Sequence, residues 1–144
     1  MKLIHRPIAH LDDRGIIRDI FERGAPDSVT HLTFHDRHSR GYHVHFESTQ
    51  YLYVVSGTLR TLHAPAIRIA PENDWKFYAR LSGDVQRVTM ETGDLIEHPP
   101  GEAHAYIAYG PVVALAFAQG VRQGSDYEKD TYKVLSGNAP WTGG

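Results

Sequence analysis

Short β-type segments, separated by residues that favour turns, run along almost the whole chain, and this pattern most restricts its fold. Strands are expected at 15–21, 29–35, 41–46, 50–56, 58–63, 87–90, 94–98, 103–108 and 112–117. Turns are expected at Ser56-Gly57-Thr58, Ser82-Gly83-Asp84, Thr92-Gly93-Asp94 and Tyr109-Gly110-Pro111. No long amphipathic helix pattern interrupts this series. Many short strands at regular spacing predict an all-β sandwich or barrel.

The length of 144 residues fits one domain with a substantial core. We expect a barrel at 1–135, with a long loop at 64–74 where two prolines occur, and a flexible glycine-rich tail at 136–144. The net charge of −2 gives no reason to expect nucleic acid or a membrane surface as a partner. The sequence contains no cysteine, no signal-peptide pattern and no apolar run of membrane-spanning length, which together favour a cytoplasmic protein.

Two histidines, His43 and His45, stand at alternate positions of one expected strand. Side chains at i and i+2 of a strand lie on the same face, so the two imidazoles can converge. His104 follows the turn Pro99-Pro100-Gly101 and begins another expected strand. Three imidazoles with open positions beside them are a common way to hold Zn, Fe, Ni or Mn. The interpretation without a metal is that these histidines are buried polar residues satisfied by hydrogen bonds.

Gln50 is the expected fourth ligand or a close neighbour of the metal. It lies five residues after His45, so a straight strand would turn it to the other face, but a bend at Glu47-Ser48-Thr49 restores it. A carboxamide offsets none of the charge of a divalent ion, so a site of three histidines and Gln50 should be a stronger Lewis acid and a weaker binder than one with a carboxylate. Glu47 ranks below Gln50 because it precedes the bend.

The same residues resemble the two sequence motifs of the cupin superfamily. Gly41-Tyr42-His43-Val44-His45, Gln50 and Gly57 resemble the first motif, with Gln in the usual place of Glu. Gly93, Pro99-Pro100-Gly101 and His104 resemble the second, with Ala108 in the usual place of Asn. The resemblance implies an RmlC-like cupin fold, which is a double-sheet jelly-roll β-barrel, in a single domain.

Other short motifs resemble the nucleotide-sugar branch of the cupins. Asp12-Asp13-Arg14-Gly15 resembles the N-terminal strand of dTDP-4-dehydrorhamnose 3,5-epimerases, and Arg40-Gly41-Tyr42-His43 resembles their Arg-Gly-x-His, in which the histidine is the general base. The latter segment with His45 and Gln50 looks closer still to the 3,4-ketoisomerases, which work without metal and usually lack a counterpart of His104. The segments at 82–104 and 130–132 are similar to the zinc-binding cupin domain of capsule-sugar biosynthesis proteins.

These resemblances imply proton abstraction next to a carbonyl of a keto-sugar nucleotide, with the enediolate stabilised by a cation. His43 is a candidate catalytic residue, but a ring nitrogen that binds metal cannot also act as the base. Tyr106, two residues after His104 and on its face, is the other candidate acid or base, although an aromatic residue lining the barrel is the ordinary alternative. Arg40 and Arg60, and also Arg68, are candidates for contacts with a diphosphate or carboxylate, and only Arg40 belongs to a motif.

Two other classes of function remain open. One is an Fe- or Ni-dependent dioxygenase acting on a small carbonyl or phenolic substrate, and the other is a non-catalytic module that binds a sugar. In each case the partner is a small molecule. We also expect a homodimer, because the apolar segments 51–55 and 112–117 offer more β-surface than one core of this size needs.

Overall fold

The computed structural model describes residues 1–22, 26–69, 77–120 and 130–135. Its described residues form eleven strands and no helix: β1 (Lys2–His5), β2 (His10–Asp12), β3 (Gly15–Ile17), β4 (Ser28–Phe34), β5 (Ser39–Val44), β6 (Thr49–Ile69), β7 (Tyr78–Leu81), β8 (Gln86–Glu91), β9 (Asp94–His98), β10 (Glu102–Gln119) and β11 (Tyr132–Val134). The expected all-β fold is therefore confirmed. Within the described part of the chain, no helical segment has the length and hydropathy needed to cross a bilayer. The expected tail at 136–144 lies outside the described residues.

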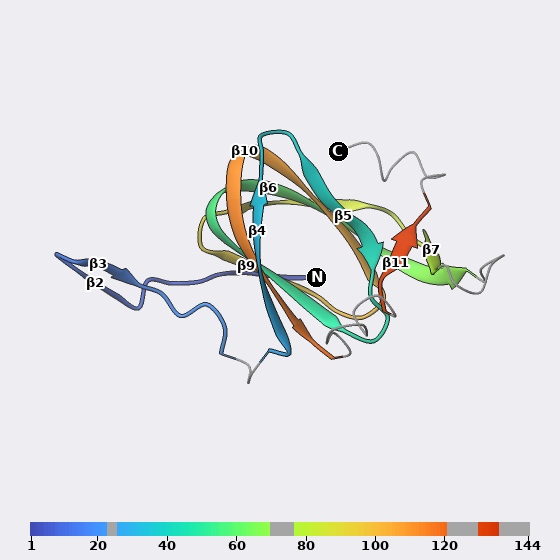
Figure 1. Ribbon diagram of the computed structural model, residues 1–144, viewed down its shortest axis with the longest axis horizontal. Helices are drawn as coiled ribbons and strands as arrows, with labels where there is room; N and C mark the ends of the chain where they lie inside the picture. Colours follow the sequence, from blue (N-terminus) through green and yellow to red (C-terminus); the bar gives the residue numbers. More distant parts are fainter. Residues whose placement is uncertain (23–25, 70–76, 121–129, 136–144) are drawn as a thin grey trace.

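One nine-stranded sheet carries the fold, in the order β1-β9-β6-β7-β11-β5-β10-β4 with β8 added to β6. It folds back on itself because β6 also pairs with β10 along most of its length, which closes a ring of strands. Figure 1 shows these strands wrapping around a common interior, while the β2–β3 hairpin projects away from them. The pairing is antiparallel throughout the described sheet except between β7 and β11.

Two strands are much longer than the sequence pattern predicts. The turns predicted at Ser56-Gly57-Thr58 and Tyr109-Gly110-Pro111 are bends inside β6 and β10, which run on for 21 and 18 residues. Gly57 and Gly110 have φ angles of 106° and 86°, a region that glycine enters without steric cost. The register between β6 and β10 shifts at the second bend, so one continuous strand passes from one side of the barrel to the other.

The loop predicted at 64–74 is wrong over its first part, because β6 continues to Ile69. Pro65 lies opposite Glu102 of β10, and from Ala66 onward β6 pairs with β7. A proline removes one backbone donor but does not end a strand whose neighbouring residues stay paired. The rest of that predicted loop, from residue 70, lies outside the described residues.

The barrel interior is filled from both sides by alternating apolar residues. Leu52, Val54, Leu59, Met90 and Ile96 are almost completely buried in one cluster, which Phe34 and Tyr106 join. Full burial of one such side chain stabilises the fold by roughly 1.5–3 kcal/mol. This apolar cluster occupies one end of the interior, and the polar residues of the candidate site occupy the space beside Tyr106.

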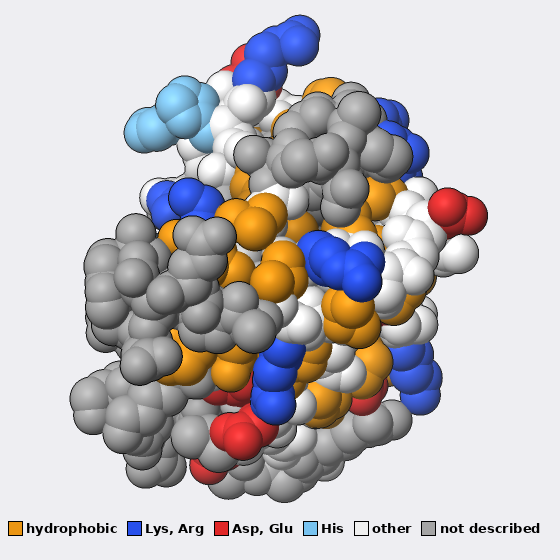
Figure 2. Space-filling view, turned by 90° about the vertical axis from the view of Figure 1, so that its right-hand side faces the viewer, with side chains coloured by type: hydrophobic (Ala, Val, Ile, Leu, Met, Phe, Trp, Pro, Cys, Tyr) orange, Lys and Arg blue, Asp and Glu red, His pale blue; other side chains and the backbone are white. Residues whose placement is uncertain are grey.

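The face at the β7–β11 end is only partly apolar on its surface. Figure 2 shows hydrophobic side chains gathered near the middle of this face, with Lys and Arg side chains among them. The guanidinium of Arg68 lies over the rings of Phe46 and Tyr132, at 4.8 and 5.5 Å from their centroids. These contacts are cation–π interactions on the outside of the barrel, so Arg68 is not directed into the interior.

Candidate functional site

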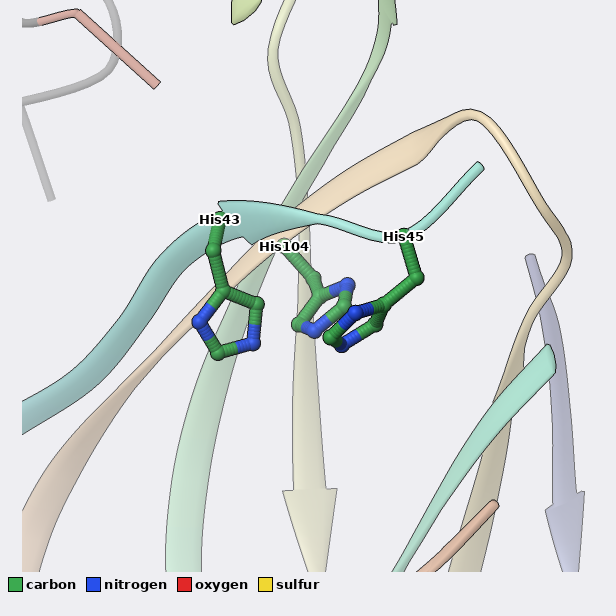
Figure 3. A group of neighbouring side chains, drawn as sticks. All are labelled: His43, His45 and His104. Atoms are coloured by element: carbon green, nitrogen blue, oxygen red, sulfur yellow. The ribbon is translucent and has the colours of Figure 1, made fainter. Parts of the chain in front are cut away.

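Three imidazoles meet inside the barrel, as the spacing of the histidines predicts. His43 belongs to β5, His45 follows directly after it, and His104 belongs to β10. One ring nitrogen of each can be chosen so that all three lie within 4.8 Å of one another. Figure 3 shows the three side chains projecting to the same side of their strands and towards one another.

A β-bulge at Tyr42 aims His43 at this cluster. Across the β5–β10 pair, His43 lies opposite His104 and Gly41 lies opposite Ala105, so Tyr42 is an extra residue on β5. Tyr42 has a φ of 60°, which only a constrained backbone imposes on a residue with a side chain. A Cβ on Gly41 would lie 2.8 Å from the carbonyl oxygen of His104, so only glycine permits this close approach.

The same bulge places Arg40 on the face of the histidines. Arg40 lies opposite Tyr106, and Tyr106 shares a face of β10 with His104. Residues three apart on a regular strand would point to opposite faces, but the extra residue brings Arg40 and His43 to the same one. The guanidinium of Arg40 donates to the carbonyl oxygen of Thr33 and lies over the Phe34 ring.

A pocket of about 210 Å³ opens beside the cluster. Its polar lining comes from Arg40, His43, Gln50 and Tyr106, and Thr30 and Leu32 of β4 also line it. His45 and His104 do not line it, since they are buried behind His43 with exposed fractions of 3% and 1%. The pocket thus reaches the imidazole cluster on its His43 side.

The structure does not bring Arg60 to this pocket. Arg60 lies opposite Ile107 in the β6–β10 ladder, whereas the neighbouring pair of Thr61 and Tyr106 faces the interior. Alternation therefore turns Arg60 to the outside of the barrel, where its guanidinium lies 5.3 Å from the centroid of the Tyr109 ring.

The Asp-x-Arg-Gly motif lies in the projecting β2–β3 hairpin. Within it, the carboxylate of Asp12 accepts hydrogen bonds from the side chain and backbone N–H of Arg14. These bonds lower the pKa of Asp12 to about 2. Neither residue is part of the wall of the 210 Å³ pocket.

Gln50 reaches the cluster because the chain bends at Phe46 and Glu47 before β6 begins. Its Oε1 atom lies 2.9 Å from Nε2 of His45, and its Nε2 atom lies 3.3 Å from the Tyr106 hydroxyl. Gln50 therefore joins the imidazole cluster to the pocket.

The tautomers of His45 and His104 follow from their hydrogen bonds. Nδ1 of His45 lies 2.9 Å from the carbonyl oxygen of Asp130, and Nδ1 of His104 lies 3.2 Å from that of Glu102. A carbonyl only accepts, so both Nδ1 atoms carry a proton. In the neutral form of each ring, Nε2 then carries a lone pair. Burial, together with the neighbouring histidines, holds the pKa of His104 well below its ordinary value, which keeps its ring neutral.

These residues offer donor atoms of the kind that divalent cations bind. Nε2 of His45 and Oε1 of Gln50 both present lone pairs, and such atoms repel at 2.9 Å unless a cation or a proton lies between them. Nε2 of His104 is buried and has no hydrogen-bond partner among the described residues. Without a cation, either His45 is protonated at both ring nitrogens and donates to Gln50, or the amide of Gln50 turns so that its nitrogen donates to His45.

A second layer of buried polar residues, which the motifs do not indicate, lies behind His104. His98 packs nearly parallel to His104, with ring centroids 4.3 Å apart, and His63 lies opposite His104 in the β6–β10 ladder. Nδ1 atoms of His98 and His63 lie 2.8 and 3.2 Å from the two carboxylate oxygens of Glu102. Burial works against ionisation of Glu102, but the hydrogen bonds from these histidines outweigh it and hold its pKa below the ordinary value.

The sequence holds a weak signal for these residues. His104 and Tyr106 mark the inward face of their strand, because side chains alternate with period two. The residues paired with them on neighbouring strands also face inward, but finding these residues requires the register. His98 immediately precedes the Pro-Pro-Gly turn, and Asp130 is separated from His45 by 85 residues. A single sequence gives no register, so these contacts emerge only from the fold.

Solved structures with the same fold include a dTDP-4-dehydrorhamnose 3,5-epimerase and a 3,4-ketoisomerase. The chain is similar to a dTDP-4-dehydrorhamnose 3,5-epimerase from Sulfolobus tokodaii, with a TM-score of 0.64 and 17% identity over 81% of this chain and 68% of that chain. It is similar to a mutant of the 3,4-ketoisomerase QdtA from Thermoanaerobacterium thermosaccharolyticum in complex with TDP-4-keto-6-deoxyglucose, with a TM-score of 0.67 and 16% identity over 92% of this chain and 86% of that one.

A third similar structure is the capsular polysaccharide assembling protein CapF from Staphylococcus aureus. Its TM-score is 0.55, with 18% identity over 90% of this chain and 34% of that chain. No protein-family profile and no curated protein sequence matches the chain.

The described strands form a closed ring whose interior holds the histidine cluster. The similar structures place this barrel more narrowly, in the RmlC-like cupin fold. The fold expected from the two cupin motifs is thereby confirmed. The pocket and the histidine cluster occupy the interior of that fold.

Proposed function

We propose that this chain is an isomerase or epimerase that moves a proton at the carbon next to the carbonyl group of a keto-sugar nucleotide. The observation that carries the proposal is the pocket, in which a cation (Arg40), an imidazole (His43), an amide (Gln50) and a phenol (Tyr106) share one wall. Further support comes from the fold, which is shared with a 3,4-ketoisomerase solved in complex with TDP-4-keto-6-deoxyglucose.

The chemistry needs one base and one group that favours negative charge on the carbonyl oxygen. A base in the pocket removes the proton on the carbon next to the carbonyl. The electrons of the broken C–H bond form a carbon–carbon double bond, and those of the C=O π bond move onto the oxygen. The substrate is then an enediolate with its negative charge on that oxygen. Reprotonation of the former carbonyl carbon, with transfer of the neighbouring hydroxyl proton to the former carbonyl oxygen, completes an isomerisation. Reprotonation of the original carbon on its other face completes an epimerisation. Arg40, at the exposed side of the pocket, holds an anionic part of the substrate.

Two residues of the pocket wall are proposed for the proton transfer. His43 is the base if its imidazole contacts substrate, and Tyr106 takes this role if His43 is a metal ligand. Tyr106 is 2% exposed, and its hydroxyl lies 3.3 Å from the Gln50 amide, so Gln50 orients the phenol.

We propose further that His43, His45 and His104, with Gln50 as fourth ligand, hold a divalent Zn, Ni, Fe or Mn ion. When bound, such an ion supplies a positive charge beside the pocket, which favours an oxyanion there. The support is that Nδ1 of both His45 and His104 carries a proton, and that Nε2 of His45 and Oε1 of Gln50 lie 2.9 Å apart.

The test is proton exchange with solvent. In D₂O, NMR should show deuterium entering next to the keto group of a dTDP-, UDP- or GDP-linked 4-keto-6-deoxyhexose. His43→Ala or Tyr106→Phe should slow this exchange, and Arg40→Ala should raise the substrate KM. Arg60→Ala is the matched control, because it removes the same charge from the outer face of the barrel. No exchange with any of these substrates, in protein loaded with each metal, contradicts the proposal.

A second candidate function is a metal-dependent dioxygenase, and the observation that favours it is the cluster of three imidazoles. Its substrate would be a small carbonyl or phenolic compound. Oxygen consumption by protein loaded with Fe(II) or Ni(II), in the absence of solvent exchange into keto-sugar nucleotides, would support it over the isomerase. Activity with Zn(II), or without any redox-active metal, would support the isomerase.

A further inference from the structure

Asp130 makes two kinds of contact with the segment that carries His45 and Gln50. Its carboxylate accepts hydrogen bonds from the backbone N–H groups of Phe46, Glu47 and Ser48, at 2.8, 3.1 and 2.9 Å. Its own carbonyl oxygen accepts from Nδ1 of His45 at 2.9 Å. Asp130 is 2% exposed, so these bonds are shielded from water. One buried residue therefore fixes both the bend before Gln50 and the tautomer of His45.

Glu102 repeats this arrangement for His104. Its carbonyl oxygen lies 3.2 Å from Nδ1 of His104, and its carboxylate accepts from Nδ1 of His98 at 2.8 Å and from that of His63 at 3.2 Å. His98, held in this way, lies nearly parallel to the His104 ring, at an interplanar angle of 14°. The carbonyl of Glu102 thus fixes the tautomer of His104, and its carboxylate fixes the ring that packs against it.

We propose that Asp130 and Glu102 are positioning residues that prepare His45 and His104 to bind a cation through Nε2. This inference rests on the metal site of the proposed function. The main-chain carbonyl of each acid accepts a hydrogen bond from Nδ1 of one imidazole and so fixes the position of its proton. The carboxylate of Asp130 holds the bend after His45, and that of Glu102 holds His98, which packs against His104. Neither carboxylate is itself a ligand.

Asp130 and Glu102 also bring negative charge close to a set of ligands that carries no charge of its own. Three neutral imidazoles and an amide leave the full charge of a divalent ion uncompensated. The carboxylates of Asp130 and Glu102 lie one layer outside. That of Asp130 accepts from backbone N–H groups, and that of Glu102 contacts two imidazoles and the N-terminal ammonium of Met1. Partners of metal ligands in this second layer commonly change metal affinity 10–100-fold when they are removed.

The first experiment measures the tautomers in metal-free protein. Long-range ¹⁵N–¹H correlation spectra of ¹⁵N-histidine-labelled protein distinguish a ring protonated at Nδ1 from one protonated at Nε2. The signals are assigned by comparison with His45→Gln and His104→Gln variants. We expect both His45 and His104 as the Nδ1–H form. An Nε2–H form, or an equal mixture of the two, at either residue overturns the inference.

The second experiment measures metal affinity in Asp130→Asn and Glu102→Gln. Both replacements keep the main-chain carbonyl and nearly the same shape, and circular dichroism checks that they fold. Competition titration with Zn(II), and the absorption spectrum of the Co(II) form, should show affinity roughly 10–100-fold weaker than in the wild type and an altered Co(II) spectrum. Glu91→Gln is the matched control, since it removes one carboxylate from an exposed strand end, and its affinity should stay within about 2-fold.

The outcomes separate this inference from the metal proposal beneath it. A wild type that binds no metal contradicts the metal site, while the tautomer measurement still decides whether Asp130 and Glu102 prepare the rings. A wild type that binds metal, with Asp130→Asn and Glu102→Gln unchanged in affinity and in Co(II) spectrum, overturns the positioning role alone.

Discussion

Replacing Gly41 by alanine should destabilise the fold far more than an ordinary glycine substitution, because two backbones meet at this residue. Gly41 has a φ of 101°, and a Cβ there would lie 2.8 Å from the carbonyl oxygen of His104 and 3.0 Å from the Cα of Ala105. Both contacts are with backbone atoms, so no side chain can rotate away to relieve them. The two strands that carry the histidines have to move apart.

The expected cost follows from two terms of different origin. Holding an alanine in the left-handed region costs about 1–3 kcal/mol. Separating two packed strands costs about 1–3 kcal/mol, by analogy with overpacked cores. The lower backbone entropy of the unfolded chain returns about 0.4–1 kcal/mol. Gly41→Ala should therefore lower the free energy of unfolding by about 3 kcal/mol.

Gly110→Ala separates the two terms. Gly110 has a similar φ of 86°, but nothing lies within 4 Å of the position of its Cβ. Gly110→Ala therefore strains the backbone without creating a clash, and its free energy of unfolding should fall by only about 1 kcal/mol. Urea unfolding of the wild type and both variants gives the three free energies by linear extrapolation. If both variants lose the same free energy of unfolding, β5 does not approach β10 closely at Gly41. The placement of His43 opposite His104 would then be refuted as well.

The remaining predictions concern the metal, the amide and the quaternary structure. His43→Ala and His104→Ala should each strip the metal or weaken its binding sharply, measured by elemental analysis of protein purified without a histidine tag, because an incomplete set of imidazoles remains. Gln50→Glu should tighten binding of a divalent ion by adding a negative charge to the ligand set. If titration shows weaker binding instead, Gln50 orients substrate and is not a ligand. Light scattering at micromolar concentration should give the mass of a homodimer, and a monomeric mass would contradict the expected use of the apolar β-surface.

Local spacing in the sequence was enough to predict that the imidazoles of His43 and His45 converge. The interval of two between His43 and His45 fixes their common face on any strand, and the bend that restores Gln50 is required by its distance from His45. The two cupin motifs predicted the fold, because together they specify which strand pairs bring His104 to the same place.

Features that depend on register could not be predicted in this way. The bulge at Tyr42 puts Arg40 on the same face of β5 as His43. It lies where Gly41 approaches the backbone of His104. Gly57 and Gly110 signal turns in the sequence but bend continuous strands in the fold, since both flanking segments find partners in the ladder. The contact between Asp130 and the bend before Gln50 spans more than 80 residues, and no local pattern encodes it.

His43 is the residue at which the proposed metal site and the proposed base compete. His45 and His104 are buried away from the pocket and have fixed tautomers, so both suit a ligand and neither can reach a substrate. His43 is half-buried and lines the pocket, so it can meet either partner. Solvent exchange that survives removal of the metal and is lost in His43→Ala assigns the base to His43. Exchange that stops when the metal is removed, and that is also lost in Tyr106→Phe, assigns the base to Tyr106. In that case His43 is a metal ligand, and the phenol is the remaining acid–base group of the pocket wall.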